Sequence, residues 1–434
     1  MRENSEMMSS ALVLCSLAFT MATTVSNAQQ PLPRSAPESQ GVSSRSLLEL
    51  TNTLDERFDG IHSLMIVRNG KVITEGWWAP YDAQQNHVLY SLSVSFTSTA
   101  VGLAVAEGEL DIDDRVLRYF PAEAPDNISE NRRLMRVRDI LTMTTGHQDV
   151  PPVKARQISA RSFLAQPVPH APGTHFKYNT AATFMQSALV QKLTGQTVLE
   201  YLRPRLFEPL GIEHPVWDTN FQGISLGGYG LRVRTEDIAK LGQLYLQKWV
   251  ELATTKQVHN GNNPRNDWEQ GYGFQFWRCR HNAYRGDGAF SQFCIVIPAQ
   301  QTVVAITSGE RDMQAVMNVV WDRLLPALAA KRLDVNPETW GQLRKRFERL
   351  SVKQPSGACT SPIASRLYNR RCEFVANALK CESVAIQSAD LDEHLILNLV
   401  GLASSWRYRL ALASGRRGSR HIRRAGPYDY LTSR

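Results

Sequence analysis

The pattern of apolar positions predicts helices and strands interleaved along the chain. Apolar residues recur at helical spacing over residues 44–58. Residues 62–78 read as a strand, a turn and a second strand, because Asn69-Gly70 supplies the positive φ angles that a two-residue hairpin needs. A helix is expected to begin near Ser91, and from Phe96 to Leu110 the side chains are small and apolar on nearly every side. That pattern is typical of a helix buried inside a large domain.

Further along, helical patterns and long loops fill residues 111–235, and Thr235 is the expected N-cap of a helix that runs to Leu246. Strands are expected over residues 272–277, 293–297 and 302–307, and a long helix over residues 313–328. This order predicts an α+β fold, in which an antiparallel sheet takes strands from the N- and C-terminal segments and is flanked by helices.

The same pattern sets the expected domain organisation. One domain is expected over residues 29–330, with a mostly helical insertion at about residues 111–235. A C-terminal region, residues 331–434, follows it and ends in a basic tail.

The N-terminus carries an export pattern. Residues 7–25 are apolar and small, and Ser26-Asn27-Ala28 follows them, so residues 1–28 are predicted to be a signal peptide. An N-terminal membrane anchor is the alternative, but the stretch is rich in Ser and Thr and short for a span. We therefore expect a periplasmic or secreted protein with no stable membrane insertion after signal removal.

Composition and charge narrow the function classes. The 434 residues are 43% hydrophobic and 21% charged, as in soluble globular proteins. The net charge of +8 is concentrated at the end, where residues 415–434 hold six arginines against one aspartate. Nucleic-acid binding would need an organised basic stripe, so we expect no nucleic-acid partner. The oligomeric state stays open.

Five cysteines remain after the predicted signal peptide. Cys279 and Cys294 lie in two strand-like runs, and a disulfide between them is favoured if those strands are neighbours. Cys359, Cys372 and Cys381 then leave an odd thiol. No cysteine or histidine has zinc-type spacing, so the sequence predicts no metal and no cofactor.

Candidate chemistry begins at the start of the buried helix. Ser91 and Val94 are three residues apart, so on a helix they share one face. A serine hydroxyl is a weak nucleophile at neutral pH and needs a neighbouring base. Valine has no proton-accepting group and can only pack. Taken alone, this serine-rich stretch is a helix start with capping hydroxyls.

Several segments in a fixed order change that interpretation. They are Ser91–Val94, Leu141–Gly146, Phe176–Thr180, Glu208–Ile212, Gly227–Leu231 and Arg285–Ala289. Together they resemble the β-lactamase and penicillin-binding serine hydrolase superfamily, in particular its class C-like β-lactamase-related proteins, esterases, D-alanyl peptidases and aminohexanoate-dimer hydrolases. The resemblance covers about residues 33–330. It implies a β-lactamase/transpeptidase-like fold, and it places Val94 where the family's Ser-x-x-Lys motif has its lysine.

The resemblance implies the catalytic groups. Ser91 matches the acylated nucleophile, and the backbone N–H groups of Ser91 and Ala289 would form the oxyanion hole. Tyr178 matches the tyrosine of the family's Tyr-x-Asn motif, which handles the protons of the nucleophile and the leaving group. Without the resemblance, Tyr178 reads as a half-buried tyrosine with a satisfied hydroxyl.

Substrate-binding positions follow in the same way. Thr180 stands where the family has asparagine, with Asn179 beside it, and both are candidates for binding the substrate. Gly286 and Gly288 match the strand that carries Lys-Thr-Gly or His-x-Gly in the family, so the cationic position is lost as well. The alternative for Gly286-Asp287-Gly288 is a simple turn between strands.

Two functions remain open at this point. The first is an exported serine hydrolase that acts through an acyl-enzyme on a small-molecule or peptide-like ester, amide or β-lactam-like substrate, impaired by loss of the lysine. The second is a catalytically inactive relative, a pseudoenzyme that serves as a binding or scaffold protein. The sequence does not distinguish the substrates. Five aromatic residues are candidates for an acyl pocket or for the core: Trp77, Trp78, Tyr229, Tyr272 and Trp277.

Overall fold

The computed structural model describes residues 31–150, 153–246 and 251–353, together with residues 366, 370–375, 383–389, 394–400 and 406–411. The predicted signal peptide and the arginine-rich tail lie outside the described residues. The chain divides into two compact units, Met1–Leu350 and Ser351–Arg434. The domain limit near residue 330 stays a prediction.

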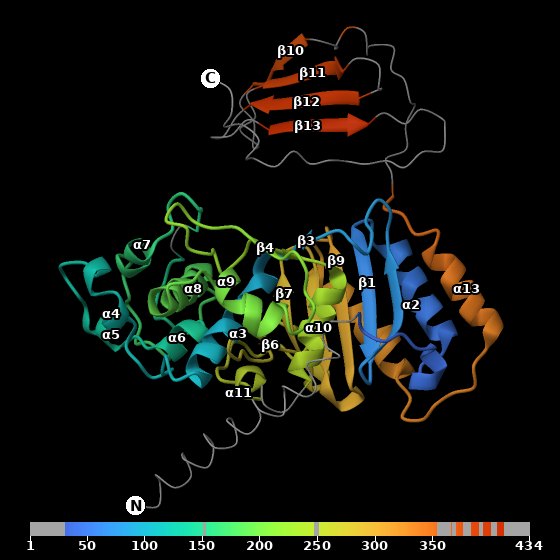
Figure 1. Cartoon of the computed structure of the whole chain (residues 1–434), viewed down its shortest axis with the longest axis horizontal. Helices are drawn as coiled ribbons and strands as arrows, with labels where there is room; N and C mark the ends of the chain where they lie inside the picture. Colours follow the sequence, from blue (N-terminus) through green and yellow to red (C-terminus); the bar gives the residue numbers. More distant parts are fainter. Residues whose placement is uncertain are drawn as a thin grey trace, which may run out of the picture. The chain divides into compact units, whose positions relative to one another are not determined.

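A six-stranded antiparallel sheet forms the centre of the first unit (Figure 1). The strands are β1 (Ile61–Arg68), β2 (Lys71–Trp77), β6 (Trp277–Arg278), β7 (Tyr284–Gly288), β8 (Gln292–Ile297) and β9 (Thr302–Ser308). Their order is β2-β1-β9-β8-β7-β6. Since β1 pairs with β9, the sheet joins the N-terminal hairpin to strands from more than 200 residues later in the chain. This confirms the predicted α+β fold.

The predicted hairpin is confirmed in detail. Asn69 and Gly70 have φ angles of 48° and 74°, as a tight turn between two twisted strands requires. Ser63 pairs with Trp77, and Arg68 pairs with Lys71 at the turn. The local Asn-Gly signal was sufficient to predict this element.

Helices cover the sheet. α10 (Thr235–Tyr245) packs against β1, β8 and β9. α2 (Ser44–Arg57), α12 (Met313–Val319) and α13 (Pro337–Phe347) form a second group, in which α2 contacts both of the others. The helical segment from Met313 continues through a π-helical turn, Val320–Leu324, and a 3-10 turn, Leu325–Ala327, so the expected long helix is present as three successive helical pieces.

The helical region lies at the opposite end of this unit from α2 and α13 (Figure 1). Its elements are α4 (Val116–Tyr119), α5 (Glu130–Leu134), α6 (Val137–Leu141), α7 (Ala160–Leu164), α8 (Thr180–Thr194), α9 (Val198–Leu202), α11 (Glu251–Thr254) and a small sheet of β3 (His87–Val88), β5 (Leu231–Val233) and β4 (Val216–Trp217). α8 packs directly on α3 (Ser93–Ala106).

α3 is buried on nearly all sides, as the sequence predicted. Its hydroxyl groups are satisfied by loop carbonyls instead of water: Ser95 donates to Gln275 O (3.0 Å), Ser98 to Phe274 O (2.8 Å) and Thr97 to Gly227 O (2.9 Å). Buried hydroxyls need such partners. The hydrogen bonds of these serine and threonine residues therefore hold two loops, at Gly227 and at Phe274–Gln275, against α3.

Two local predictions are corrected. The N-cap of α10 is Arg234, whose N–H is bound by the Asp237 carboxylate (2.9 Å), and the Thr235 hydroxyl hydrogen-bonds to Ser63 (2.7 Å). Of the expected strand 272–277, only Trp277 lies in the sheet, because Gln275 has a φ of 65° and turns the chain.

The favoured disulfide is wrong, since Cys279 and Cys294 are both free. β7 lies between their strands: Cys294, on β8, is opposite Gly286 of β7, whereas Cys279 follows β6. Cys294 Sγ contacts Ile238 O of α10 (3.4 Å), and Cys279 Sγ accepts a hydrogen bond from Arg285 (3.1 Å). The two thiols therefore have unrelated surroundings.

The second unit contains a four-stranded antiparallel sheet. Its strands, in spatial order, are β10 (Arg370–Glu373), β11 (Ser383–Ala389), β12 (His394–Val400) and β13 (Trp406–Ala411). Within the described parts of both units, no helix has the length and hydrophobicity to cross a bilayer.

Candidate active site

Ser91 lies in a single 3-10 turn, Tyr90–Leu92, immediately before α3. Tyr90 has a φ of 48°, a left-handed conformation that residues other than glycine rarely adopt and that is often found at functional sites. The Ser91 side chain is half-buried, and its hydroxyl lies beside the hydroxyl of Tyr178. The structure therefore brings together the two residues that the sequence assigned to the chemistry.

Tyr178 is held by aromatic neighbours. The Trp277 ring is stacked on it, with centroids 5.6 Å apart and an interplanar angle of 12°. Tyr272 meets it edge-on, at 6.5 Å and 87°. Stacked and edge-on contacts of this kind restrict a ring to one orientation. Tyr178 comes from the loop before α8, so the helical region and the sheet meet at this side chain.

The Tyr178 phenol is protonated at neutral pH. Burial of its hydroxyl raises the pKa well above the ordinary value, the adjacent Ser91 hydroxyl opposes that rise, and the nearby Asp287 charge adds to it. A phenol in this state can donate a proton or relay one, but it is a poor base.

Val94 packs at the position where a base was expected by analogy. It is 3% exposed and lies one helical turn after Ser91. Its neighbours are engaged elsewhere: the Ser93 hydroxyl donates to Tyr90 O (2.7 Å), and Ser95 donates to Gln275 O. The helix start therefore supplies no proton acceptor of its own at position 94.

The glycines of β7 permit a close approach to the Ser91 segment. A Cβ atom added to Gly288 would lie 2.0 Å from Leu89 O and 2.9 Å from Leu92 N. One added to Gly286 would lie 2.5 Å from Ser95 Oγ. Only glycine fits where two backbones pack this tightly. These residues form a strand, so the turn interpretation of Gly286–Gly288 is wrong.

Ala289 follows directly and is exposed. The rings of Tyr90 and Phe290, which neighbour Ser91 and Ala289 in the sequence, are 5.2 Å apart. The role of the Ser91 and Ala289 backbone N–H groups stays a prediction.

Asn179 and Thr180 begin α8. Asn179 is fully buried, and its Oδ1 caps the helix by accepting from the N–H groups of Ala181 (3.0 Å) and Ala182 (3.3 Å). Thr180 is half-buried, with its methyl group against Gly228, where an added Cβ would lie 2.5 Å from it. The substrate-binding role of Asn179 and Thr180 stays a prediction.

The aromatic residues considered for an acyl pocket lie in different parts of the first unit. Tyr272 and Trp277 contact Tyr178, as described above. Trp78 is 2% exposed and donates to Asp55 Oδ1 (2.6 Å) beside α2, so it belongs to the core at the other end of the sheet. Tyr229 uses its hydroxyl to bind Val153 O.

Sequence reasoning missed an ion pair on β7. Arg285 is 0% exposed and Asp287 is 6% exposed, and their side chains pair at 2.9 Å. Burial raises the Asp287 pKa, and the Arg285 guanidinium opposes that effect. Residues two apart on a strand share a face, so the spacing of Arg285 and Asp287 was the available signal. Among the described residues, no cluster of acidic, histidine or cysteine side chains could hold a metal ion.

Comparison with known proteins agrees with this arrangement. The beta-lactamase family model matches residues 54–327. An Escherichia coli K12 protein named "Putative D-alanyl-D-alanine carboxypeptidase" is 23% identical over 243 residues, which cover 47% of this chain and 55% of that protein. The chain thus spans about half the length of the curated relatives that it matches.

Solved structures show the same fold. A penicillin-binding protein homologue from Caulobacter crescentus has a TM-score of 0.54 at 14% identity, covering 64% of this chain and 97% of its own. The octameric penicillin-binding protein homologue from Pyrococcus abyssi has a TM-score of 0.53 at 16% identity, covering 85% and 90%. At such identities the likeness concerns the fold alone.

Proposed function

This chain belongs to the beta-lactamase family, and on that premise we propose that it is an exported serine hydrolase in which Ser91 takes up the acyl group of an ester, amide or β-lactam-like substrate. The substrate class is small-molecule or peptide-like. The observation that carries the proposal is that the Ser91 turn packs against the glycine strand β7 with the hydroxyl of Tyr178 beside that of Ser91.

The proposed reaction uses Tyr178 as a neutral relay. Ser91 Oγ attacks the substrate carbonyl carbon, and the oxyanion is held by the backbone N–H groups of Ser91 and Ala289. The Ser91 proton passes to the phenol oxygen while the phenol proton passes to the leaving group, so no phenolate accumulates. The bond to the leaving group breaks and an acyl-Ser91 ester remains. Water then attacks this ester and regenerates Ser91.

The rate is expected to be low, because Val94 contributes no base. Removing one member of a coupled catalytic group commonly costs several orders of magnitude. Activated esters should be least affected, since their leaving groups need little protonation.

The burial of Val94 also favours a second function. An apolar side chain that is 3% exposed beside the nucleophile suits a non-catalytic relative that retains the cleft for binding or as a scaffold. In that case Ser91 is present but never acylated.

Labelling of Ser91 separates the two functions. The purified chain is treated with a fluorophosphonate probe and digested, and the modified peptide is identified by mass spectrometry, beside a p-nitrophenyl acetate assay. The hydrolase predicts slow labelling and hydrolysis, both absent in Ser91→Ala. The binding protein predicts an unlabelled wild type that becomes labelled in Val94→Lys. Labelling that persists in Ser91→Ala would mean that another residue is the nucleophile.

Export is a separate part of the proposal. It rests on the sequence of residues 1–28 and predicts that the protein recovered from the periplasm or medium begins at Gln29. N-terminal sequencing of that fraction tests it, and an intact Met1 in the recovered protein would contradict it.

A further inference from the structure

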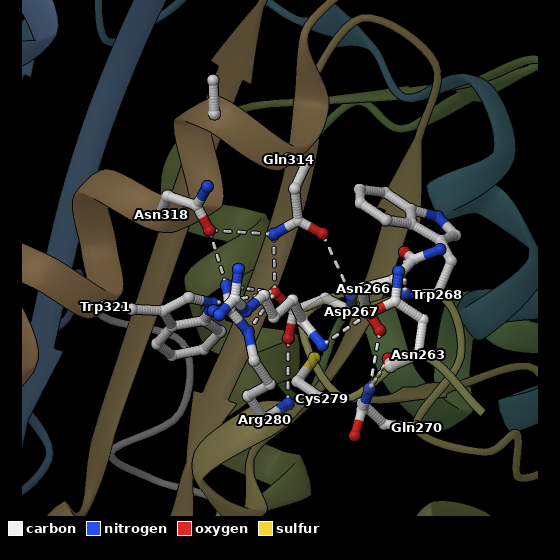
Figure 2. A network of polar contacts seen from close by, with 12 residues as sticks. Asn263, Asn266, Asp267, Trp268, Gln270, Cys279, Arg280, Gln314, Asn318 and Trp321 are labelled. Carbon is white, nitrogen blue, oxygen red and sulfur yellow. Dashed lines mark hydrogen bonds and ion pairs between the residues drawn. The ribbon is translucent and has the colours of Figure 1, made fainter. Parts of the chain in front are cut away.

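A chain of buried polar contacts connects the loop around Asp267 to Tyr178. Asp267 is 0% exposed, and its carboxylate accepts hydrogen bonds from the Arg280 backbone N–H (2.8 Å), Nε (3.0 Å) and Nη2 (2.8 Å). Gln314 Nε2 (2.7 Å) and Trp321 Nε1 (3.0 Å) donate to the same carboxylate (Figure 2). These donors, from two separate segments, hold Asp267 in one position.

Arg285 extends this chain toward the active site. Its Nη1 donates to Asp267 O (2.8 Å) and to Cys279 Sγ (3.1 Å), and its guanidinium lies 4.2 Å from the centroid of the Trp268 ring. Its Nε donates to Asp287 Oδ2 (3.0 Å). The guanidinium is therefore fixed on several sides and presents one edge to Asp287.

Trp277 completes the connection. It is paired with Arg285 across β6 and β7, and the Arg285 guanidinium lies 5.7 Å from the centroid of the Trp277 ring. The other face of this contact is the active site, because the Trp277 ring is stacked on Tyr178. The ion pair therefore helps to set where the Trp277 ring lies.

We propose that the Arg285–Asp287 pair positions Tyr178: Arg285 packs on the Trp277 ring, and Trp277 in turn fixes the phenol ring that is stacked on it. Asp287 and the loop at Asp267 hold Arg285 in place. The catalytic consequence rests on the proposed function, whereas the placement of the ring does not.

Stability alone does not account for this ion pair. A buried pair of charges is often no more stabilising than apolar side chains of similar volume. Here the pair lies on β7, the strand that packs against the Ser91 turn, and Arg285 contacts the tryptophan that covers Tyr178. The Asp287 charge also helps to keep the phenol protonated, which is the state that can donate to a leaving group.

The test exploits the difference between stability and position. The double variant Arg285→Met/Asp287→Leu replaces the pair with apolar side chains and removes the guanidinium from the Trp277 ring. The matched control is Asp55→Leu/Arg346→Met, because this acid–arginine pair also contacts a tryptophan: Asp55 accepts the indole N–H of Trp78 (2.6 Å). Both proteins are labelled with 3-fluorotyrosine and studied by fluorine NMR.

The Tyr178 resonance is identified as the one that is missing in Tyr178→Phe. In Arg285→Met/Asp287→Leu we expect this resonance to move, because the Trp277 ring above it is displaced, and in the control we expect it to stay. An unmoved resonance in the folded double variant would overturn the proposal, and so would an equal movement in the control. If the double variant does not fold, Arg285→Lys gives the same measurement, since lysine keeps the charge but lacks the planar guanidinium that packs on the Trp277 ring.

Kinetics supply the second readout. With p-nitrophenyl acetate as substrate, we expect kcat of Arg285→Met/Asp287→Leu to be about 100-fold below that of the wild type, with little change in KM. That pattern is expected when a catalytic group is misplaced. The control should keep the wild-type kcat. If the wild type has no hydrolytic activity, the proposed function fails, and the fluorine measurement still decides the placement of Tyr178.

Discussion

Substitution of Val94 by lysine is the change that tests most directly how this site is built. Val94 is 3% exposed, so the substitution sacrifices about 2 kcal/mol of apolar burial. Burial also lowers the pKa of a lysine, by about 3 to 5 pH units in enclosed sites. At about 1.4 kcal/mol per pH unit, the charged form costs about 4–7 kcal/mol. Whole domains have only about 5–15 kcal/mol of stability, so the loss at pH 7 should be large.

The sign of the pH dependence follows from the lowered pKa. Between the folded-state pKa of the lysine introduced by Val94→Lys and its unfolded value near about 10.4, the unfolded chain binds more protons. The full penalty is therefore present below the folded pKa, and stability recovers as pH rises toward the unfolded value. Val94→Met is the matched control, because it changes length without adding a charge.

Two assays follow from this. Thermal unfolding from pH 6 to 10 should show that the deficit of Val94→Lys relative to Val94→Met shrinks as pH rises. Fluorophosphonate labelling of Ser91 should accelerate by about 10²–10⁴-fold above the folded pKa, where the amine is a neutral base. A folded Val94→Lys protein that labels no faster than Val94→Met at pH 9 would refute the assignment of position 94.

Three further predictions concern single sites. In Gly288→Ala the new Cβ would lie 2.0 Å from Leu89 O, a backbone atom that cannot move freely. We therefore expect denaturant titrations to show about 1–3 kcal/mol of destabilisation, and Ser91 to be labelled more slowly. Unchanged stability and labelling would contradict the close approach of β7 to the Ser91 turn. Without reductant, Cys279 and Cys294 should both react with a thiol reagent after denaturation, and an intact Cys279–Cys294 disulfide in the peptide map would refute the strand order. Burial lowers the His147 pKa to about 4, below its unfolded value of about 6.5. The unfolded chain therefore binds the proton more tightly, and the protein should lose about 3 kcal/mol of stability as pH falls from 6.5 to 4 and none above 6.5. His147→Gln should flatten the stability profile between pH 6.5 and 4.

Elements with local causes could be predicted from the sequence. The Asn69-Gly70 hairpin depends on two positive φ angles, and α3 depends on an unbroken run of small apolar residues. The hydroxyls of Ser95 and Ser98 looked like capping groups in the sequence. In the structure they bind carbonyls from residues about 180 positions later, which no local pattern encodes.

The candidate site divides in the same way. The ordered segments around Ser91 and Tyr178 identified two residues whose hydroxyls lie side by side, although 87 positions separate them. No comparable signal identified Arg285 and Asp287. Beside two glycines they read as a turn, and their importance comes from Trp277, on the neighbouring strand β6, and from the distant loop at Asp267.

By itself, then, the sequence determined the fold class, the hairpin and the buried helix, and it predicted Ser91 as the nucleophile with Val94 at the family's lysine position. Each of these depends on side-chain periodicity, on turn chemistry or on a segment that resembles a known family. Only the tertiary structure decided that β7 separates Cys279 from Cys294. It also decided that the buried Arg285–Asp287 pair lies next to Trp277, whose ring is stacked on Tyr178. The physical reason is that strand order and burial arise from contacts between distant segments. A charged residue shows which partner it has only after the chain has folded around it.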